Sequence, residues 1–401
     1  PLKMKNIFLN ILAITLFAIV SCDNTNKEEL SSDDYNKAAK HLNKNLNKYT
    51  FNVLISSEWN NEDFFFYSVK DENKIKNFKI DLKTNTKIIS KKKSKKNTFS
   101  SNKNELVSPN GQLSAFIHNY NLWVRDLNNN KTNQLTFNGE KDYGYGTNNA
   151  GWIKTDSPVL KWSPNSDKIA TFRQDARGVG EMYLTTTNVG HPKLKAWKYA
   201  LPGDKKIFEI ERLIIDLNNN SIVRFNMAND YQRSTTTDHI AGRNGELLDT
   251  QWNQNGTKLA FVSSSRDHKT AHLQIADVNT GNISSIFKEN TITYYESGVG
   301  SENWKVLFET DEFIWYSEKD NWGHLYLYDL KTKQLKNKIT TGEWLVRKLL
   351  YVDNDKRELF FTAGGRESGN PYHIYLYKIN FDGTGLKCLT PEIGSHKINP
   401  S

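Results

Sequence analysis

The stretch Trp162-Ser-Pro-Asn-Ser-Asp-Lys-Ile-Ala-Thr-Phe172 joins a tight turn to a short apolar strand, and variants of this unit recur along the chain. The unit begins with a turn of the Ser-Pro-Asn-Gly type, followed by an apolar strand and then by a second strand that often ends in aspartate. The copies span residues 64–82, 108–136, 162–184, 252–278, 313–340 and 358–390. A diverged pair of strands, 207–215 and 221–225, is expected to fill the remaining gap.

These repeats predict an all-β fold, a β-propeller built of four-stranded blades. The copy number indicates about seven blades over residues 50–395. Alternating helices and strands are missing, so a doubly wound parallel sheet is not expected. Unrelated β-sandwiches would not repeat the turn and the aspartate-ended strand together.

Composition and charge exclude several classes of protein. Of the 401 residues 37% are hydrophobic and 12% aromatic, which is too many for a disordered chain. A mean hydropathy of −0.68 argues against a membrane bundle, and two cysteines argue against a disulfide scaffold. The net charge of +9 suggests nucleic acid, but the main basic cluster, residues 91–96, is expected to be a solvated loop. We therefore expect no nucleic-acid partner.

The N-terminus resembles a bacterial lipoprotein signal. A basic start at Met4-Lys5 precedes an apolar run, residues 7–20, that is too short to span a membrane, and Cys22 follows a small residue. We expect residues 1–21 to be a signal peptide, with residues 1–3 upstream of the true start. Cys22 is then the lipidation site and residues 22–49 a polar tether with a short helix around 35–46. The alternative is an ordinary signal peptide with an incidental cysteine. The expected location is the bacterial cell envelope, lipid-anchored in the periplasm or at the outer membrane.

Catalytic and metal motifs are scarce. The 401 residues contain no G-x-S-x-G, H-E-x-x-H, C-x-x-C or P-loop sequence. His268 and His272 are four residues apart, but on a strand-like hairpin this spacing separates them by about 13 Å. We expect no metal and no cofactor.

The densest polar cluster is the segment from Arg173 to Glu181, which also holds Asp175 and Arg177. These charges could line the mouth of the propeller and bind an ionic end of a substrate. The alternative, which we favour, is structural pairing within a hairpin. Further mouth candidates without independent support are Asp156, Arg212, Arg233 and Arg243.

Several stretches resemble the N-terminal propeller of dipeptidyl peptidase IV-type serine peptidases, in the prolyl oligopeptidase family. They are residues 159–164 with 169–173, 190–194 with 199–204, 315–326, and 339–344. The resemblance covers about residues 50–396. It implies eight blades, the last incomplete here, in a propeller at residues 50–401.

The resemblance also implies a function. In that family the propeller caps an α/β-hydrolase domain that follows it and supplies a Ser-Asp-His triad. We therefore expect a fragment that lacks the catalytic domain, takes peptide substrates, and works with the downstream domain of the same polypeptide. A homodimer is a further expectation. No catalytic residue is expected within this chain.

One departure from the family concerns residues 151–158. Dipeptidyl members carry a pair of glutamates after a tryptophan-containing stretch, and the pair holds the amino terminus of the substrate. This chain keeps Trp152 but has no glutamate pair, so Asp156 is at best a single-carboxylate substitute. The sequence therefore does not predict that the protein releases dipeptides.

The expected function is to admit peptides to a peptidase active site and hold them there during proteolysis. The main alternative is a standalone envelope propeller that binds or scaffolds other proteins without peptidase activity. A third class, a propeller enzyme such as a glycan lyase, lacks a paired-carboxylate signature here.

Overall fold

The computed structural model describes residues 30–42, 51–60, 63–71, 74–90, 104–147, 157–187, 189–232, 247–295 and 303–398. The chain divides into two compact units, residues 1–98 and 99–401, and each is described by itself. The expected signal peptide and Cys22 lie outside the described residues. Within the described part of the chain, no helix is long and apolar enough to cross a membrane.

The first unit contains one helix and one antiparallel sheet. Helix α2 (Ser32–Lys40) begins with a capping box between Ser31 and Asp34, in the region where the sequence predicts a short helix. The sheet has the order β1-β2-β3-β4. Its strands are β1 (Val53–Asn60), β2 (Phe64–Asp71), β3 (Lys74–Asp81) and β4 (Thr86–Ile89). This is a four-stranded meander of the blade type.

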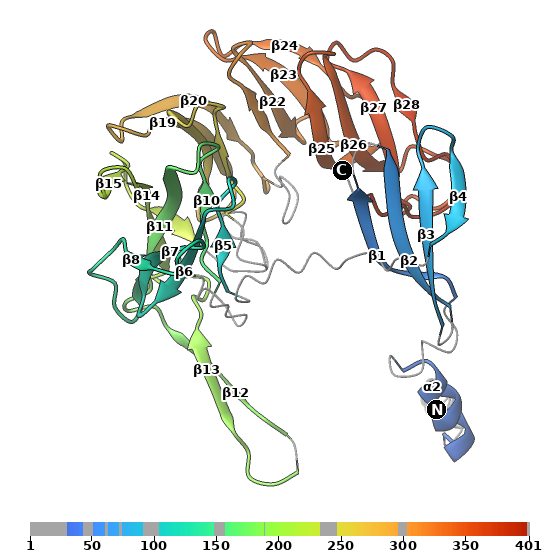
Figure 1. The fold of residues 1–401 in the computed structure, drawn as a ribbon, viewed down its shortest axis with the longest axis horizontal. Helices are drawn as coiled ribbons and strands as arrows, with labels where there is room; N and C mark the ends of the chain where they lie inside the picture. Colours follow the sequence, from blue (N-terminus) through green and yellow to red (C-terminus); the bar gives the residue numbers. More distant parts are fainter. Residues whose placement is uncertain are drawn as a thin grey trace, which may run out of the picture. The chain divides into compact units, whose positions relative to one another are not determined.

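The second unit contains five consecutive blade sheets (Figure 1). The first is β5 (Leu106–Val107), β6 (Leu113–His118), β7 (Asn121–Asp126) and β8 (Thr132–Gln134). The second combines β9 (Tyr143–Tyr145), β10 (Lys161–Trp162), β11 (Lys168–Asp175), β14 (Phe208–Asp216), β15 (Ser221–Arg224) and β16 (Asp230–Gln232). The third is β17 (Thr250–Trp252), β18 (Lys258–Ser264), β19 (Thr270–Asp277) and β20 (Ile283–Asn290).

The last two sheets have the same order. The fourth is β21 (Lys305–Leu307), β22 (Glu312–Ser317), β23 (His324–Asp329) and β24 (Leu335–Lys338). The fifth is β25 (Leu345–Asp353), β26 (Glu358–Gly364), β27 (Tyr375–Asn380) and β28 (Lys387–Cys388). In each, the first and fourth strands are the two edges of the sheet, and Figure 1 shows the fourth strands β24 and β28 on the outside, so the first strand is the inner edge.

The repeated turn forms because its first side chain caps the strand that follows. Ser163 Oγ accepts a hydrogen bond from the backbone N–H of Lys168 at 2.9 Å. Ser108 Oγ accepts from Leu113 N–H at 3.0 Å, and Asn253 Oδ1 accepts from the N–H five residues on at 2.9 Å. A short polar side chain at this position therefore satisfies a backbone donor that the turn leaves unpaired.

The aspartate that ends the third strand of many blades caps the next turn. The Oδ1 atoms of Asp126, Asp277 and Asp329 each accept the backbone N–H two residues further on, at 2.8, 3.0 and 3.0 Å. These Asx turns direct the chain from the third strand into the fourth. Both repeated features that identify the fold in the sequence thus have a backbone-capping role.

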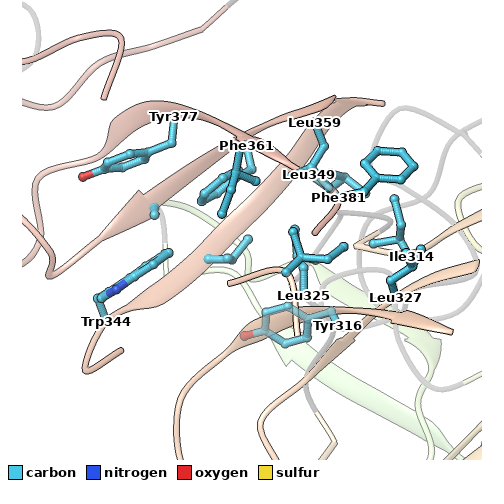
Figure 2. Close-up of a cluster of buried hydrophobic side chains, with 14 of the residues drawn as sticks. Ile314, Tyr316, Leu325, Leu327, Trp344, Leu349, Leu359, Phe361, Tyr377 and Phe381 are labelled. Atoms are coloured by element: carbon cyan, nitrogen blue, oxygen red, sulfur yellow. The ribbon is translucent and has the colours of Figure 1, made fainter. Parts of the chain in front are cut away.

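The hydrophobic core lies between adjacent blades rather than inside any one of them. Figure 2 shows the cluster between the fourth and fifth blades, with Leu325 and Leu327 on one side and Leu349, Phe361 and Phe381 on the other. The Trp344 ring stacks near Phe361 at a centroid distance of 6.1 Å. Burial on both faces of the central strands explains why they are apolar without strict alternation.

The structure confirms the all-β propeller class, and the described residues form six blade-type sheets. Two details of the predicted blade boundaries were wrong. The strand at 181–184 does not continue the second blade, because β12 (Glu181–Thr185) pairs only with β13 (Leu194–Lys198) in a separate hairpin. Instead β14 and β15, predicted as a separate diverged pair, complete that blade, because β14 pairs with β11 over eight residues and β15 pairs with β14.

Candidate functional site

The inner strands of the second unit are joined across blade boundaries by side-chain hydrogen bonds. Trp162 Nε1 donates to the backbone oxygen of Leu106 at 3.1 Å, and Trp252 Nε1 donates to that of Lys161 at 3.3 Å. A tryptophan on each of two inner strands therefore reaches the inner strand of the preceding blade. An unpaired strand edge gains a partner in this way.

Two side-chain amides, of the half-buried Gln251 and the buried Asn303, also bond to the backbone of the following blade. The Gln251 side chain accepts from Val306 N–H at 2.9 Å and donates to Val306 O at 2.7 Å, as a neighbouring strand would do. Asn303, which is 1% exposed, accepts from Leu349 N–H at 2.9 Å and donates to Arg347 O at 3.2 Å. Side-chain hydrogen bonds thus link the strands β5, β10, β17, β21 and β25 in series, and we call these five strands the inner surface of the second unit.

The predicted charged segment is only partly brought together. Arg177 and Asp175 form a local ion pair, with 2.8 Å between Nη2 and Oδ2. This hydrogen bond lowers the pKa of the Asp175 carboxyl. Arg173 pairs instead with Glu211 on the adjacent strand, at 2.8 Å from Nη2 to Oε2. Glu181 lies exposed on β12, where it accepts a hydrogen bond from Tyr183.

Tyr143 connects the two arginines of this segment. Its ring centre lies 4.3 Å from Arg173 Cζ and 3.7 Å from Arg177 Cζ, so both guanidinium groups make cation–π contacts. Asp175, Arg177 and Arg173 therefore each have a charged partner close by. A role of this segment in substrate binding stays a prediction.

Other sequence candidates have different outcomes. Trp152, Asp156, Arg233 and Arg243 lie outside the described residues. Arg212 is described but does not face a channel mouth, because its side chain is only 4% exposed. Among the described residues, no group of three or more His, Cys, Asp or Glu side chains is arranged to hold a metal ion.

Arg212 is the centre of a buried ionic cluster that joins the second and third blades. It donates to Asp230 from Nε and to Asp249 from Nη2, both at 2.6 Å. Burial raises the pKa of the Asp249 carboxyl, although the guanidinium opposes the shift. Asp230 also accepts from Ser263 Oγ at 2.8 Å. The two aspartates are 19 residues apart, and no motif along the chain indicates that they share one arginine.

His324 is a second buried polar residue that the sequence did not single out as functional. Its Nδ1 lies 3.0 Å from Thr340 Oγ1, and its Nε2 lies 2.9 Å from Gly342 O. Because Thr340 Oγ1 already accepts from Leu325 N–H, its own proton is available to a neutral imidazole nitrogen. Burial lowers the pKa of His324, so the side chain is neutral and structural.

Residues 63–401 match the family described as "Dipeptidyl peptidase IV (DPP IV) N-terminal region". The chain belongs to this family. The dipeptidyl peptidase IV N-terminal family thus accounts for the blades of both units and for the segments quoted above from the sequence.

Relatives of this dipeptidyl peptidase IV N-terminal chain are distant. A Neosartorya fischeri protein named "Probable dipeptidyl-aminopeptidase B" is 21% identical over 311 residues, which cover 71% of this chain and 32% of that protein. An Arthroderma benhamiae protein named "Probable dipeptidyl peptidase 4" is 24% identical over 304 residues, 71% of this chain and 35% of that protein. The chain therefore spans about a third of the length of these curated relatives.

A solved structure supports the fold. The crystal structure of Porphyromonas gingivalis dipeptidyl peptidase 4 matches with a TM-score of 0.59 at 18% identity, over 85% of this chain and 44% of that one. At this level of identity the likeness shows a common fold and carries no residue roles.

Proposed function

We propose that this chain is the substrate-admitting and peptide-holding propeller of a serine peptidase of the dipeptidyl peptidase IV type. The observation that carries the proposal is the family match over residues 63–401. The five consecutive blade sheets of the second unit support it, because they share the fold of a solved dipeptidyl peptidase 4.

In this proposal the chemistry belongs to an α/β-hydrolase domain of the same polypeptide. There a serine attacks the peptide carbonyl, a histidine accepts its proton, and backbone donors stabilise the oxyanion. The propeller limits access to short or unfolded peptides and holds them. The greater length of the curated relatives supports a parent protein of two domains.

Hydrolysis of a chromogenic X-Pro substrate tests the proposal. We expect no turnover by the 401-residue chain and turnover by the product of the complete gene. Replacing the serine of a G-x-S-x-G sequence in that product by alanine should abolish activity. Replacing the variable residue before that serine by alanine is the control and should leave activity in place. A complete gene product without such a sequence would refute the peptidase proposal and favour the alternative, a standalone binding or scaffold propeller.

We further propose that the protein acts at the cell envelope through a lipid on Cys22. The support is the short apolar run that ends at this cysteine. Cys22→Ser should move the protein from the membrane fraction to the soluble fraction. It should also abolish incorporation of radiolabelled palmitate into the protein in growing cells. Cys388→Ser is the control and should change neither readout. Unchanged membrane retention of the Cys22 variant would contradict the anchor.

A homodimer is the last part of the proposal, and hairpin β12–β13 is its suggested contact. Figure 1 shows this hairpin projecting from the second blade, and its strands pair only with each other. Tyr183, Leu184 and Leu194 are 61%, 55% and 65% exposed. A two-stranded hairpin is marginally stable alone in water, so cover by a second copy would explain these apolar side chains.

Light scattering tests the dimer. Leu194→Lys should lower the measured mass from two chains to one, while Lys195→Gln, on the same strand, should leave it unchanged. A wild-type chain that is monomeric at micromolar concentration would contradict this part of the proposal alone.

A further inference from the structure

The inner surface of the second unit carries mostly positive charge. The charged residues on its described innermost strands are Lys161, Lys305, Arg347, Lys348 and Asp353. The one acidic member, Asp353, lies at the end of β25 and pairs with Lys356 at 3.3 Å. The described inner strands therefore carry four basic residues and one acidic residue.

Arg347 occupies a bulge in the innermost strand of the fifth blade. Val346 pairs with Ala363 and Lys348 pairs with Thr362, so Arg347 is an extra residue between them. Bulges redirect side chains and are frequent beside functional sites. The bulge is held from the fourth blade, because the buried Asn303 side chain bonds to the backbone of Arg347 and Leu349.

The neighbouring strand has a glycine close to Arg347. A Cβ atom at Gly364 on β26 would meet Pro371 O at 3.0 Å, His373 O at 3.2 Å and Arg347 Nε at 3.7 Å. The backbone oxygens of Pro371 and His373 therefore leave little space for a side chain at Gly364, and Arg347 lies within van der Waals distance of this glycine position.

Arg347 and Lys348 are both exposed. The four ion pairs described for this blade use other basic side chains. Within the described part of the chain, neither Arg347 nor Lys348 takes part in an ion pair. Two adjacent cations with no carboxylate partner are available for an anionic ligand.

We propose that Arg347 and Lys348 bind a carboxylate of the peptide, so that the inner surface selects peptides with acidic side chains. The inference rests on the proposed function, because it names the class of peptide that the propeller holds. A guanidinium can take a carboxylate in two parallel hydrogen bonds, and the adjacent ammonium adds attraction over a longer range. Asn303 acts as a positioning residue for the bulge.

Fluorescence anisotropy with two labelled hexapeptides tests this inference on the full chain. The peptides are identical except that one has two glutamates where the other has two glutamines. We expect the glutamate peptide to bind about fivefold more tightly at low salt, as one or two partly exposed charge pairs allow, and the preference to fade as salt is added.

The double variant Arg347→Gln/Lys348→Gln should abolish the preference, so that the two peptides bind it with equal affinity. The control Lys288→Gln/Lys387→Gln removes the same charge from the outermost strands β20 and β28 and should retain the preference. Arg347→Lys should retain part of the preference, because an ammonium keeps the positive charge but lacks the two parallel N–H donors of a guanidinium.

The outcomes separate the two proposals. If neither peptide binds the chain, the peptide-holding function fails and this inference fails with it. If both peptides bind equally, or if the two double variants lose the preference to the same extent, the acidic-peptide inference is refuted and the peptide-holding function stands.

Discussion

Arg212 Nη2 lies 2.6 Å from Asp249 Oδ2, in an ion pair whose two side chains are 4% and 2% exposed. The pair joins the strand β14 of one blade to the start of the next, and Asp230 adds a second carboxylate to the same guanidinium. Two aspartates buried around one arginine depend on it for neutralisation.

Replacing this arginine should destabilise the protein strongly. In Arg212→Met the two carboxylates remain buried without a cation, so we expect a loss of about 3–5 kcal/mol in the free energy of unfolding. Urea denaturation followed by tryptophan fluorescence measures it. Arg177→Met, which removes an exposed ion pair, is the control and should barely move the midpoint. Equal losses in both variants would show that the buried cluster contributes no more to the free energy of unfolding than the exposed ion pair does.

Stability should fall in acid because of His324. Burial lowers its pKa in the folded state, so the unfolded state binds the proton first. The stabilisation is complete above the pKa of an unfolded histidine, about 6.5, and is lost as the pH falls below that value. Unfolding midpoints between pH 7.5 and 5 measure the loss.

A variant isolates the contribution of this histidine from that of the other titrating groups. His324→Gln keeps a polar side chain but cannot titrate, so its unfolding midpoint should fall less over the same pH range. His191→Gln, in an exposed segment, should behave like the wild type. Parallel curves for His324→Gln and the wild type would rule out His324 as a source of the acid sensitivity.

Arg266 should hold the base of the β12–β13 hairpin. Its guanidinium, in the turn between β18 and β19, donates to Asp204 O and to Leu201 O, beyond the end of β13. Arg266→Ala should speed amide hydrogen exchange in residues 181–198 about tenfold, the factor expected from losing one hydrogen bond to a charged group. Exchange in the other blades should not change, and protection of the hairpin at the wild-type level would contradict this role.

Gln251 should stabilise the contact between the third and fourth blades. Gln251→Leu removes both hydrogen bonds to the Val306 backbone and should cost about 1–3 kcal/mol, because a buried N–H and C=O lose their partners. Thermal unfolding of the variant and of Gln112→Leu, an exposed turn residue, provides the comparison. A variant as stable as the control would mean that water or another group replaces the amide.

Much of the fold was predictable because its signals are local. Ser108, Ser163 and Asn253 each open a repeated turn and cap a strand five residues on, and the aspartate that ends a strand caps the turn beside it. Such contacts act over a few residues and leave a pattern that can be read along the chain. The candidate site was less predictable: Arg173, Asp175 and Arg177 were located by charge alone, and two of the three pair locally.

The sequence by itself determined the propeller class, the positions of most strands and the family resemblance, since turn chemistry and strand periodicity depend on near neighbours. Only the tertiary structure decided that β14, rather than the segment at 181–184, completes the second blade. It alone also placed Asn303 against the bulge at Arg347 and gathered Asp230 and Asp249 around Arg212. Such contacts join residues tens of positions apart, and only the packing of one blade on the next brings them within hydrogen-bond distance.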